Sequence, residues 1–515
     1  MKKFIILFLV FTFSIILRLW NLNEVGRTWD EYEYVDHGYK MIELIKNKDF
    51  NNSFFYTSYD HPPLVKYLYG ITAYFDIENY SSDGSVNFNY DLTYSRMLSI
   101  FLFSLGVVIT VIIGWKIYSP IVGVFSGIIL SMLPFSLGLS QLVTTESLKI
   151  FIYPLVVYAY ILLIKQFSWK KVLICGVVTG LALQAKQSNF LLIPMLFFTF
   201  FFQYKLLKEE DKSGFIKSRI KSIILILLVS VAVFILLWPQ LPFHIKEVYE
   251  IHNGLWNVQF SPKIWQITLS PPEVFLGRLM LTPIFYYVVY FFITIPVLIL
   301  FLFFVGARNM LAKNNLYHIL ILLWFLFPFL LSFYSWRQHG LRYIIEIYPA
   351  IAIISAVGFQ VIASKITKKI AHQLLLFSFV VLYLSLSFWH IKPYYLDYFN
   401  ELVGGVSSVY EYKLFQIGWW GQGIREASVY VKKNAEDGSS VGLAVSPLTS
   451  VPPMPKLKTQ NYDNKKDYDY VIVNNYNVLR EKFDDTDIKN KYKPVYFVKA
   501  NNAILVTVYR FNTAQ

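Results

Sequence analysis

Residues 97–115 read MLSIFLFSLGVVITVIIGW, a run of apolar and small residues without a single charge. As an α-helix this run is long enough to cross the hydrocarbon core of a bilayer, which is about 30 Å thick. Similar apolar runs recur along the first 390 residues, for example at 187–204, 222–243, 279–307 and 347–364. The chain is 56% hydrophobic and only 16% charged, which excludes an ordinary soluble globular protein.

These runs predict a polytopic α-helical membrane protein with about eleven transmembrane helices. The fifth and sixth predicted spans are separated only by Gln184–Asn189. The predicted spans are 4–20, 97–116, 120–140, 148–164, 171–185, 188–204, 222–239, 280–306, 315–334, 345–364 and 373–390. Apart from their ends, these spans are nearly free of charged residues.

Lysine and arginine fall on one side of the membrane under this count, and such residues are retained in the cytoplasm during insertion. They occur at Lys2–Lys3, Lys165–Lys171, Lys205–Lys221, Arg308–Lys313 and Lys365–Lys369. We therefore expect a multi-pass protein of the cell membrane with a cytoplasmic N-terminus and an extracytoplasmic C-terminal domain. The first span starts with charge and lacks a small-residue cleavage site, which indicates a retained anchor.

The cysteine content and the net charge limit the classes of function that the protein can have. The single cysteine, Cys175, lies within a predicted span, so an intramolecular disulfide or a cysteine-based metal site is excluded. The net charge of +14 mostly reflects the predicted cytoplasmic loops, and a nucleic-acid partner is not expected.

Three predicted external regions, 21–95, 240–276 and 391–515, are too long to be simple connections. The first contains twelve acidic residues against five basic ones, which suggests chemistry or hydroxyl binding on that face. We divide the chain into a membrane domain, 1–400, and a soluble domain, 401–515. In the latter, helical spacing at Gln422–Lys433, short β-like runs and a terminal hairpin around Asn501–Asn502 predict a small α/β fold.

Polar motifs gather at the predicted outer surface. Trp29-Asp30-Glu31-Tyr32 follows the first span, and Asp60-His61-Pro62-Pro63-Leu64-Val65-Lys66 comes thirty residues later. The two prolines fix their φ angles, which suits a rigid loop that presents His61 and Lys66. Thr144-Thr145-Glu146 stands between the third and fourth spans on the same face.

In this order and sidedness, the motifs resemble the GT-C superfamily of glycosyltransferases, in particular the branch of protein O-mannosyltransferases and aminoarabinose transferases. The resemblance covers most of the chain. Further matching segments are Thr179–Lys186, Arg337-Gln338-His339-Gly340-Leu341-Arg342-Tyr343, Pro393–Asn400 with Leu402–Gly405, and Gly418–Gly423.

The resemblance implies transfer of a sugar from a polyprenyl or dolichyl phosphate to an acceptor hydroxyl, with inversion at the anomeric carbon. Such a reaction needs a base for the hydroxyl, and we assign Asp30 to that role. Glu31 and Glu146 are expected to orient the base or the acceptor. The alternative for Asp30 and Glu31 is a solvated helix start, where acidic residues stabilise the exposed N–H groups.

The departing phosphate needs cations, and the candidates are the basic residues that break the positive-inside pattern. They are Lys66, Lys186, Arg337 and Arg342, with His61 as a further substrate-binding candidate. The alternative for the cations is snorkelling to lipid headgroups. For His61 and His339 the alternative is a role as hydrogen-bonding scaffold.

No cofactor is expected, and a divalent metal is not required, because no spaced Asp-x-Asp or His/Cys set is present. Trp419-Trp420 resembles the double tryptophan of oligosaccharyltransferases, but Gly421 stands where that motif carries Asp. The expected partners are the lipid-linked sugar, a hydroxyl-bearing acceptor (protein, glycolipid or cell-surface polymer) and the bilayer. Two rival functions remain open: a transporter or flippase of lipid-linked sugars, and a catalytically inactive binding subunit.

Overall fold

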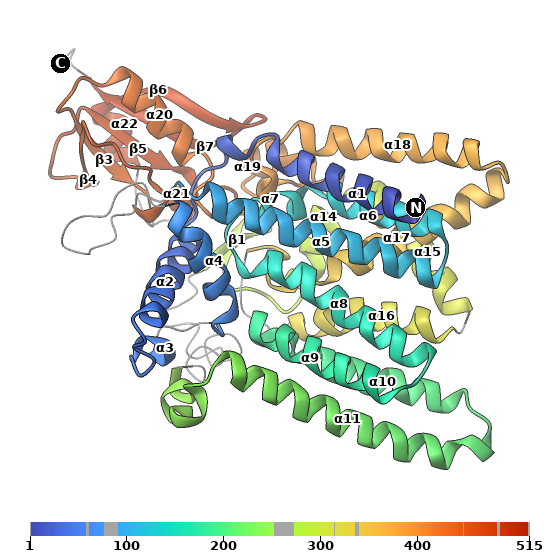
Figure 1. Cartoon of the computed structure of the whole chain (residues 1–515). Helices are drawn as coiled ribbons and strands as arrows, with labels where there is room; N and C mark the ends of the chain where they lie inside the picture. The colour runs from blue at the N-terminus through green and yellow to red at the C-terminus, as the bar shows by residue number, and fades with distance from the viewer. Residues whose placement is uncertain are drawn as a thin grey trace.

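The computed structural model describes residues 2–57, 61–76, 91–251, 272–313, 315–334, 339–445, 448–480 and 485–512. Figure 1 shows a bundle of long helices with the N-terminus at one end. At the other end lie the C-terminal sheet and the helices α2 (Trp29–Lys46), α3 (Phe54–Thr57) and α4 (Leu64–Asp76). The structure therefore has a membrane-type bundle that is capped at a single end.

The bundle is built from apolar helices whose length matches a bilayer. Its elements are α1 (Lys2–Leu19), α5 (Thr93–Ile117), α6 (Pro120–Met132), α7 (Pro134–Ser140), α8 (Thr145–Lys165), α9 (Trp169–Ala185), η2 (Gln187–Leu191), α10 (Leu192–Lys205), α11 (Glu209–Leu237), α14 (Tyr286–Thr294), α15 (Val297–Ala312), α16 (Leu316–Leu331), α17 (Ile347–Ile366) and α18 (Ile370–Trp389). Each of the eleven predicted spans thus corresponds to helix.

Fewer of these helices are long enough to span a membrane alone. Among the described residues, six single helices meet the length and hydropathy of a span, or eight if each bent pair counts as one span. The bundle is therefore a polytopic membrane fold with six to eight candidate spans. The predicted fifth, sixth and ninth spans are helices of 17, 14 and 16 residues.

Two predicted spans are bent and not straight. The axes of α6 and α7 differ by 69°, and those of α14 and α15 by 113°. Pro134 and Pro296 lie at the breaks, where a proline removes a backbone donor and clashes with the preceding turn. The predicted eighth span also starts too early, because Met280 belongs to a short strand and the helix begins at Tyr286.

Glycines set the closest helix contacts. An added Cβ at Gly306 of α15 would lie 1.9 Å from the Ile354 carbonyl oxygen of α17, and one at Gly358 would lie 1.9 Å from the Leu302 oxygen. Helix α2 (Trp29–Lys46) crosses α4 (Leu64–Asp76) in the same way, through Gly38 and Gly70. Such small residues let backbones approach closely in membrane proteins.

Short elements connect the bundle to its cap. They are η1 (Leu22–Glu24), α3 (Phe54–Thr57), η3 (Leu241–Phe243), β1 (Glu273–Phe275), β2 (Arg278–Met280), η5 (Ser332–Tyr334), η6 (Arg342–Ile344), η7 (Tyr395–Asp397), η8 (Glu401–Val403) and α19 (Gly405–Glu411). Several of them supply residues to the site described below.

The C-terminal domain is a mixed five-stranded sheet of order β4-β3-β5-β7-β6, in which only β4, β3 and β5 are parallel. Its elements are α20 (Ile424–Asn434), β3 (Ser440–Ala444), η9 (Leu448–Ser450), β4 (Lys458–Asn461), β5 (Tyr470–Asn474), α21 (Asn475–Leu479), α22 (Thr486–Lys491), β6 (Tyr492–Ala500) and β7 (Ala503–Phe511). The predicted hairpin is present, with Asn501 at positive φ in its turn. Val441 and Val506 belong to the same buried apolar cluster as the bundle, so the domain is packed onto it.

Candidate active site

Four buried charged residues meet at the capped end of the bundle. Asp30 is in the first turn of α2, Glu146 in the first turn of α8, Lys186 directly follows α9, and Arg342 opens η6. The Arg342 guanidinium donates to the Asp30 carboxylate, and its Nε lies 3.1 Å from Glu146 Oε1. Lys186 Nζ lies 2.9 Å from the same Glu146 oxygen. The result is a chain of alternating charges, Asp30–Arg342–Glu146–Lys186.

These charges are almost fully removed from solvent, with exposed fractions of 7% for Asp30, 1% for Glu146, 5% for Lys186 and 4% for Arg342. Buried charges persist only when they are paired and hydrogen-bonded. Both carboxylates also lie at helix starts, where the exposed N–H groups favour negative charge. Burial lowers the pKa of Arg342, but the carboxylates of Asp30 and Glu146 outweigh burial and raise that pKa, so the guanidinium stays charged.

Glu31 has a different environment from its neighbour Asp30. It accepts hydrogen bonds from Nε and Nη2 of Arg96 at 2.8 Å and from the backbone N–H groups of Thr28 at 2.9 Å and Val143 at 3.0 Å. Arg96 also donates to the carbonyl oxygens of Val25 and Gly26. Glu31 therefore fastens the start of α2 to α5 and to the segment before α8, and so fixes where Asp30 points.

A second buried ion pair lies next to the first. Lys149 of α8 and Glu346, directly before α17, approach to 2.5 Å, and both are at most 1% exposed. Lys149 also donates to the carbonyl oxygen of Tyr343 at 3.2 Å. Lys149 is therefore a buried charge at the end of a predicted span, and it is neutralised by the residue that precedes α17.

Aromatic rings cover Arg342, and the nearest of them belongs to the C-terminal domain. The indole of Trp420 lies over the guanidinium at 3.9 Å, Trp419 stacks on Trp420 at 5.0 Å, and His339 stacks on Trp419 at 4.5 Å. A cation against an aromatic face is stabilised by the ring quadrupole. Gly418 and Gly421, both at positive φ, bracket the two tryptophans and permit the turn that presents them.

Two further buried carboxyls support this aromatic segment and η6. Asp397 accepts a hydrogen bond from Gly418 N at 2.7 Å, and Glu273 accepts from the Tyr286 hydroxyl at 3.2 Å. The Tyr286 hydroxyl in turn accepts from Gly340 N at 3.1 Å, two residues before Arg342. Burial raises the pKa of each carboxyl to about 7.

Comparison with known proteins finds a family match in part of the chain and a similar fold over most of it. Residues 85–238 match the family described as dolichyl-phosphate-mannose-protein mannosyltransferase. The crystal structure of ArnT from Cupriavidus metallidurans bound to undecaprenyl phosphate is 12% identical, with 97% of each chain covered and a TM-score of 0.53. Part of the chain is thus similar to this mannosyltransferase family, and the whole chain is similar in fold to ArnT. The family resemblance of its motifs is thereby confirmed.

Two archaeal structures are also similar to this chain in fold. The Archaeoglobus fulgidus oligosaccharyltransferase, in its apo form, is 12% identical over 99% of this chain and 74% of its own, with a TM-score of 0.50. The same values hold for that organism's AglB in complex with an inhibitory peptide and a dolichol-phosphate. No curated protein matches the chain in sequence.

Of the other candidate residues, His61 and Lys66 lie within the described part of the chain. The His61 Nδ1 lies 3.1 Å from Gln187 Oε1, next in sequence to Lys186. Lys66 is fully buried in α4. Arg337 and Asp60 fall outside the described residues.

The part of the chain that the structure describes contains no group of three or more His, Cys, Asp or Glu side chains arranged to hold a metal ion. The site carboxylates of Asp30 and Glu146 instead face Arg342 and Lys186. The described site therefore consists of carboxylates that are paired with cationic side chains.

Sequence reasoning missed Arg96, Lys149 and Glu346. A signal existed for two of them: Lys149 follows Glu146 by three residues, and Glu346 follows Arg342 by four, so each lies about one helical turn from a chosen residue. For Arg96, in the first turn of α5, the snorkelling alternative is equally compatible with the sequence.

Proposed function

We propose that this protein transfers a sugar from a polyprenyl-phosphate carrier to an acceptor hydroxyl at the outer face of the membrane. The solved structures of similar fold that hold undecaprenyl phosphate or a dolichol-phosphate support a lipid phosphate as the donor's carrier. The observation that carries the proposal is the buried chain Asp30–Arg342–Glu146–Lys186, because it pairs a potential base with cations suited to a phosphate.

In this mechanism the donor's phosphate competes with a carboxylate for Arg342. Guanidinium binds phosphate and carboxylate with the same planar pair of donors. When phosphate takes up Arg342, the Asp30 carboxylate loses its ionic partner and becomes a better proton acceptor. Donor binding would thus activate the base at the moment the sugar is in place.

The chemical step follows from these positions. The acceptor oxygen attacks the anomeric carbon as its proton moves to Asp30, and the bond from that carbon to the phosphate oxygen breaks. Arg342 and Lys186 stabilise the negative charge that gathers on the leaving phosphate. Attack opposite to the leaving group inverts the anomeric centre.

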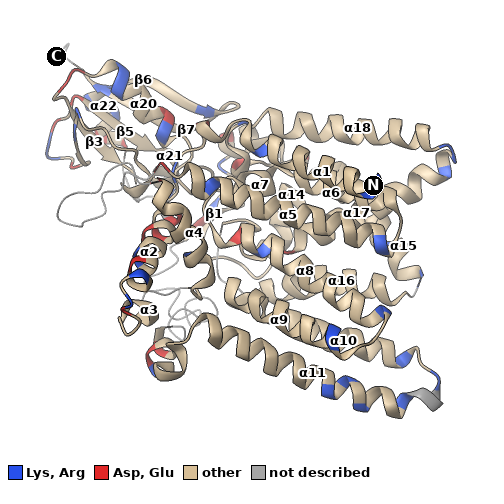
Figure 2. Ribbon diagram, in the orientation of Figure 1, with Lys and Arg blue, Asp and Glu red and all other residues tan. Residues whose placement is uncertain are grey.

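The distribution of charge supports an external site. Figure 2 shows lysine and arginine concentrated at the helix ends far from the cap, including the last turns of α8, α10 and α17. Positive residues mark the cytoplasmic ends of spans. The charge chain lies at the opposite end, which favours the extracytoplasmic face.

The transporter alternative predicts polar groups along a path through the bundle. Lys149 and Glu346 are buried and charged, but Lys149 is only four residues from the start of α8 and lies beside the site. These charges therefore extend the site and do not form a path across the membrane.

Replacing Asp30 by Asn tests the proposal, because it retains the shape and removes the base. General-base assistance is typically worth about 10²–10⁴-fold, so transfer should fall by that factor while the protein still binds undecaprenyl phosphate. Asp36→Asn, on the same helix, is the matched control and should be close to wild type. Transfer by Asp30→Asn within about threefold of wild type would assign the base to another group.

A further inference from the structure

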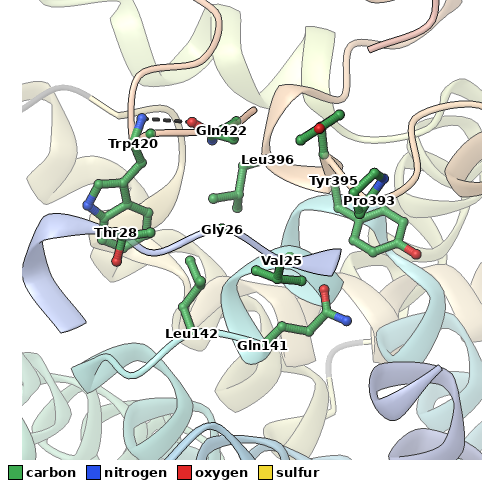
Figure 3. A pocket seen from close by; sticks show the side chains of 13 residues that line it. Val25, Gly26, Thr28, Gln141, Leu142, Pro393, Tyr395, Leu396, Trp420 and Gln422 are labelled. Carbon is green, nitrogen blue, oxygen red and sulfur yellow. Dashed lines mark hydrogen bonds between the residues drawn. The ribbon is translucent and has the colours of Figure 1, made fainter. Parts of the chain in front are cut away.

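A buried cation without a counter-ion lies at the end of the bundle opposite the cap. It is Arg219 of α11, which is 9% exposed and pairs with no carboxylate among the described residues. In the charge chain, by contrast, every cation faces a carboxylate. The cavity beside that chain, between Val25–Thr28, α7 and 420–422, measures about 30 Å³, which is room for one or two waters (Figure 3). Arg219 is therefore the place where a bound ligand would complete the structure.

Arg219 lies at the depth where lipid headgroups are expected. It precedes the uncharged run 222–239 by three residues, and Figure 2 shows lysine and arginine along this first part of α11. A cation at this depth ordinarily extends toward headgroups or water. Lys217 and Lys221 are exposed in this way, whereas Arg219 points inward on the face of α11 that also buries Ile226.

Three aromatic rings hold the guanidinium of Arg219 in a fixed position. Its Cζ lies 4.3 Å from the ring centre of Phe167, which precedes α9, 5.3 Å from that of Phe200 in α10 and 4.7 Å from that of Phe215 in α11. The rings stabilise the positive charge, but they place no oxygen against its N–H groups. The Nε of Arg219 is buried and has no acceptor within the described part of the chain. Because an unpaired buried charge is costly, an anion at the guanidinium would be favoured.

Further cations border the same place. Lys171 donates to the backbone carbonyl directly before Phe167 at 2.7 Å. Lys212 lies over the ring of Tyr204 at 5.2 Å, and that ring is 6.5 Å from the ring of Phe215. Basic pockets between transmembrane helices suit the anionic headgroups of lipids. A headgroup with an ammonium group of its own would match this positive surrounding less well.

The surface next to Arg219 is apolar, as the acyl chains of a lipid require. Ile216, Ile220 and Ile224 of α11 are exposed, and their spacing of four residues places them in one stripe along the helix. A free phosphate ion would gain nothing from this stripe, whereas an acyl chain would contact it. We propose that Arg219 binds the phosphate of an anionic glycerophospholipid whose acyl chains lie along these isoleucines. This site is separate from the charge chain and does not depend on sugar transfer.

The test is a titration of the full-length protein in detergent with dioleoyl phosphatidylglycerol, followed by native mass spectrometry. Wild type should bind the lipid, and Arg219→Gln should weaken binding about tenfold or more, the effect of losing charge-assisted hydrogen bonds. Lys217→Gln removes the same charge from the exposed face of α11 and is the matched control, which should bind like wild type. Equal weakening by both variants would show a loose attraction to the basic surface and contradict the proposal.

Two further probes test the chemistry of the ligand. Dioleoyl phosphatidylcholine has the same phosphate and acyl chains but carries an ammonium group, and it should bind wild type more weakly than phosphatidylglycerol does. Equal binding of the two lipids would contradict the anionic headgroup. Inorganic phosphate should not displace bound phosphatidylglycerol, and displacement would show a site for the free ion and contradict the proposal.

Folding of each variant is checked by thermal unfolding in detergent. If Arg219→Gln fails to fold, Arg219→Lys takes its place, because it keeps the charge but cannot hold two phosphate oxygens at once. Arg219→Lys should bind phosphatidylglycerol more weakly than wild type. Unchanged affinity in the folded variant, or no binding of phosphatidylglycerol to wild type, would overturn the proposal.

Discussion

Arg342 joins two carboxylates and an indole ring, so its replacement separates charge from shape. We expect Arg342→Ala to slow transfer by about 10²-fold or more, and to affect rate more than donor binding, because the phosphate gains charge as the bond breaks. Arg342→Lys should recover part of the rate if a point charge suffices, and none if two phosphate oxygens are held together. Single-turnover kinetics on a lipid-linked sugar would measure both effects.

The control for Arg342 is Lys368→Ala, an exposed residue at the other end of the bundle, which should behave as wild type. If donor turnover by Arg342→Ala is normal, the phosphate site lies elsewhere, with Lys186 and Lys66 as the next candidates.

We expect the buried carboxyl of Glu273 to make the stability of the protein depend on pH in an unusual way. Its pKa in the folded protein is raised to about 7 by burial, above the ordinary value of 4.5. The contribution of Glu273 to the free energy of unfolding is fully present below pH 4.5 and is lost as pH rises through 7. The reason is that the carboxyl loses its proton at a lower pH in the unfolded chain than in the folded protein. The difference between the two pKa values lowers the free energy of unfolding by about 3 kcal/mol over this pH range.

Glu273→Gln should therefore flatten the apparent Tm between pH 5 and 8 and raise it at the upper end. Scanning calorimetry in detergent would measure this. Asp397 has the same sign, so the variant should retain part of the slope. A slope identical to that of wild type would mean that Glu273 is ionised throughout this range.

Most residues of the candidate site could be predicted from the sequence, because a charged residue at the end of an apolar span is conspicuous. Asp30, Glu146, Lys186 and Arg342 were selected in this way, and the structure brings all four together. The distinction between Asp30 and Glu31 was not predictable. It depends on Arg96, whose side chain reaches Glu31 only when α5 packs beside α2.

At the level of elements, the crossing of α2 and α4 holds the helix that carries Asp30. An added Cβ at Gly70 would lie 2.3 Å from the Gly38 oxygen, so the helices would have to separate. We expect Gly70→Ala to cost about 1–3 kcal/mol and to reduce transfer by displacing Asp30. Gly214→Ala is the control, because nothing lies within 4 Å of its added Cβ.

Thermal stability and transfer should be measured together for the Gly70 variant. Wild-type values of both would show that the two helices can move apart without disturbing the site. The helices themselves were predictable from apolar runs, whereas the bends at Pro134 and Pro296 were not. An apolar run containing proline is compatible with either a kinked span or two helices at a large angle.

At the level of the whole molecule, the charge distribution predicts that the C-terminal domain lies outside the cell. Because the single native cysteine, Cys175, is buried, an introduced cysteine can be labelled selectively. Ser439→Cys should react with a membrane-impermeant maleimide on intact cells. Ser213→Cys, in the basic segment at the start of α11, should react only after permeabilisation. The reverse pattern would place the site on the cytoplasmic face.

The two ion pairs between α8 and the segment from Arg342 to Glu346, just before α17, also bear on how the chain is built into the membrane during synthesis. Glu146 and Arg342 are 196 residues apart, so α8 enters the bilayer long before Arg342 and Glu346 have been made. Until then Glu146 and Lys149, three residues apart on one helix, can neutralise each other. When Arg342 and Glu346 arrive with their own opposite charges, the four exchange partners into Glu146–Arg342 and Lys149–Glu346. Each segment thus brings a temporary counter-ion of its own, which spares the nascent chain an unpaired charge in lipid.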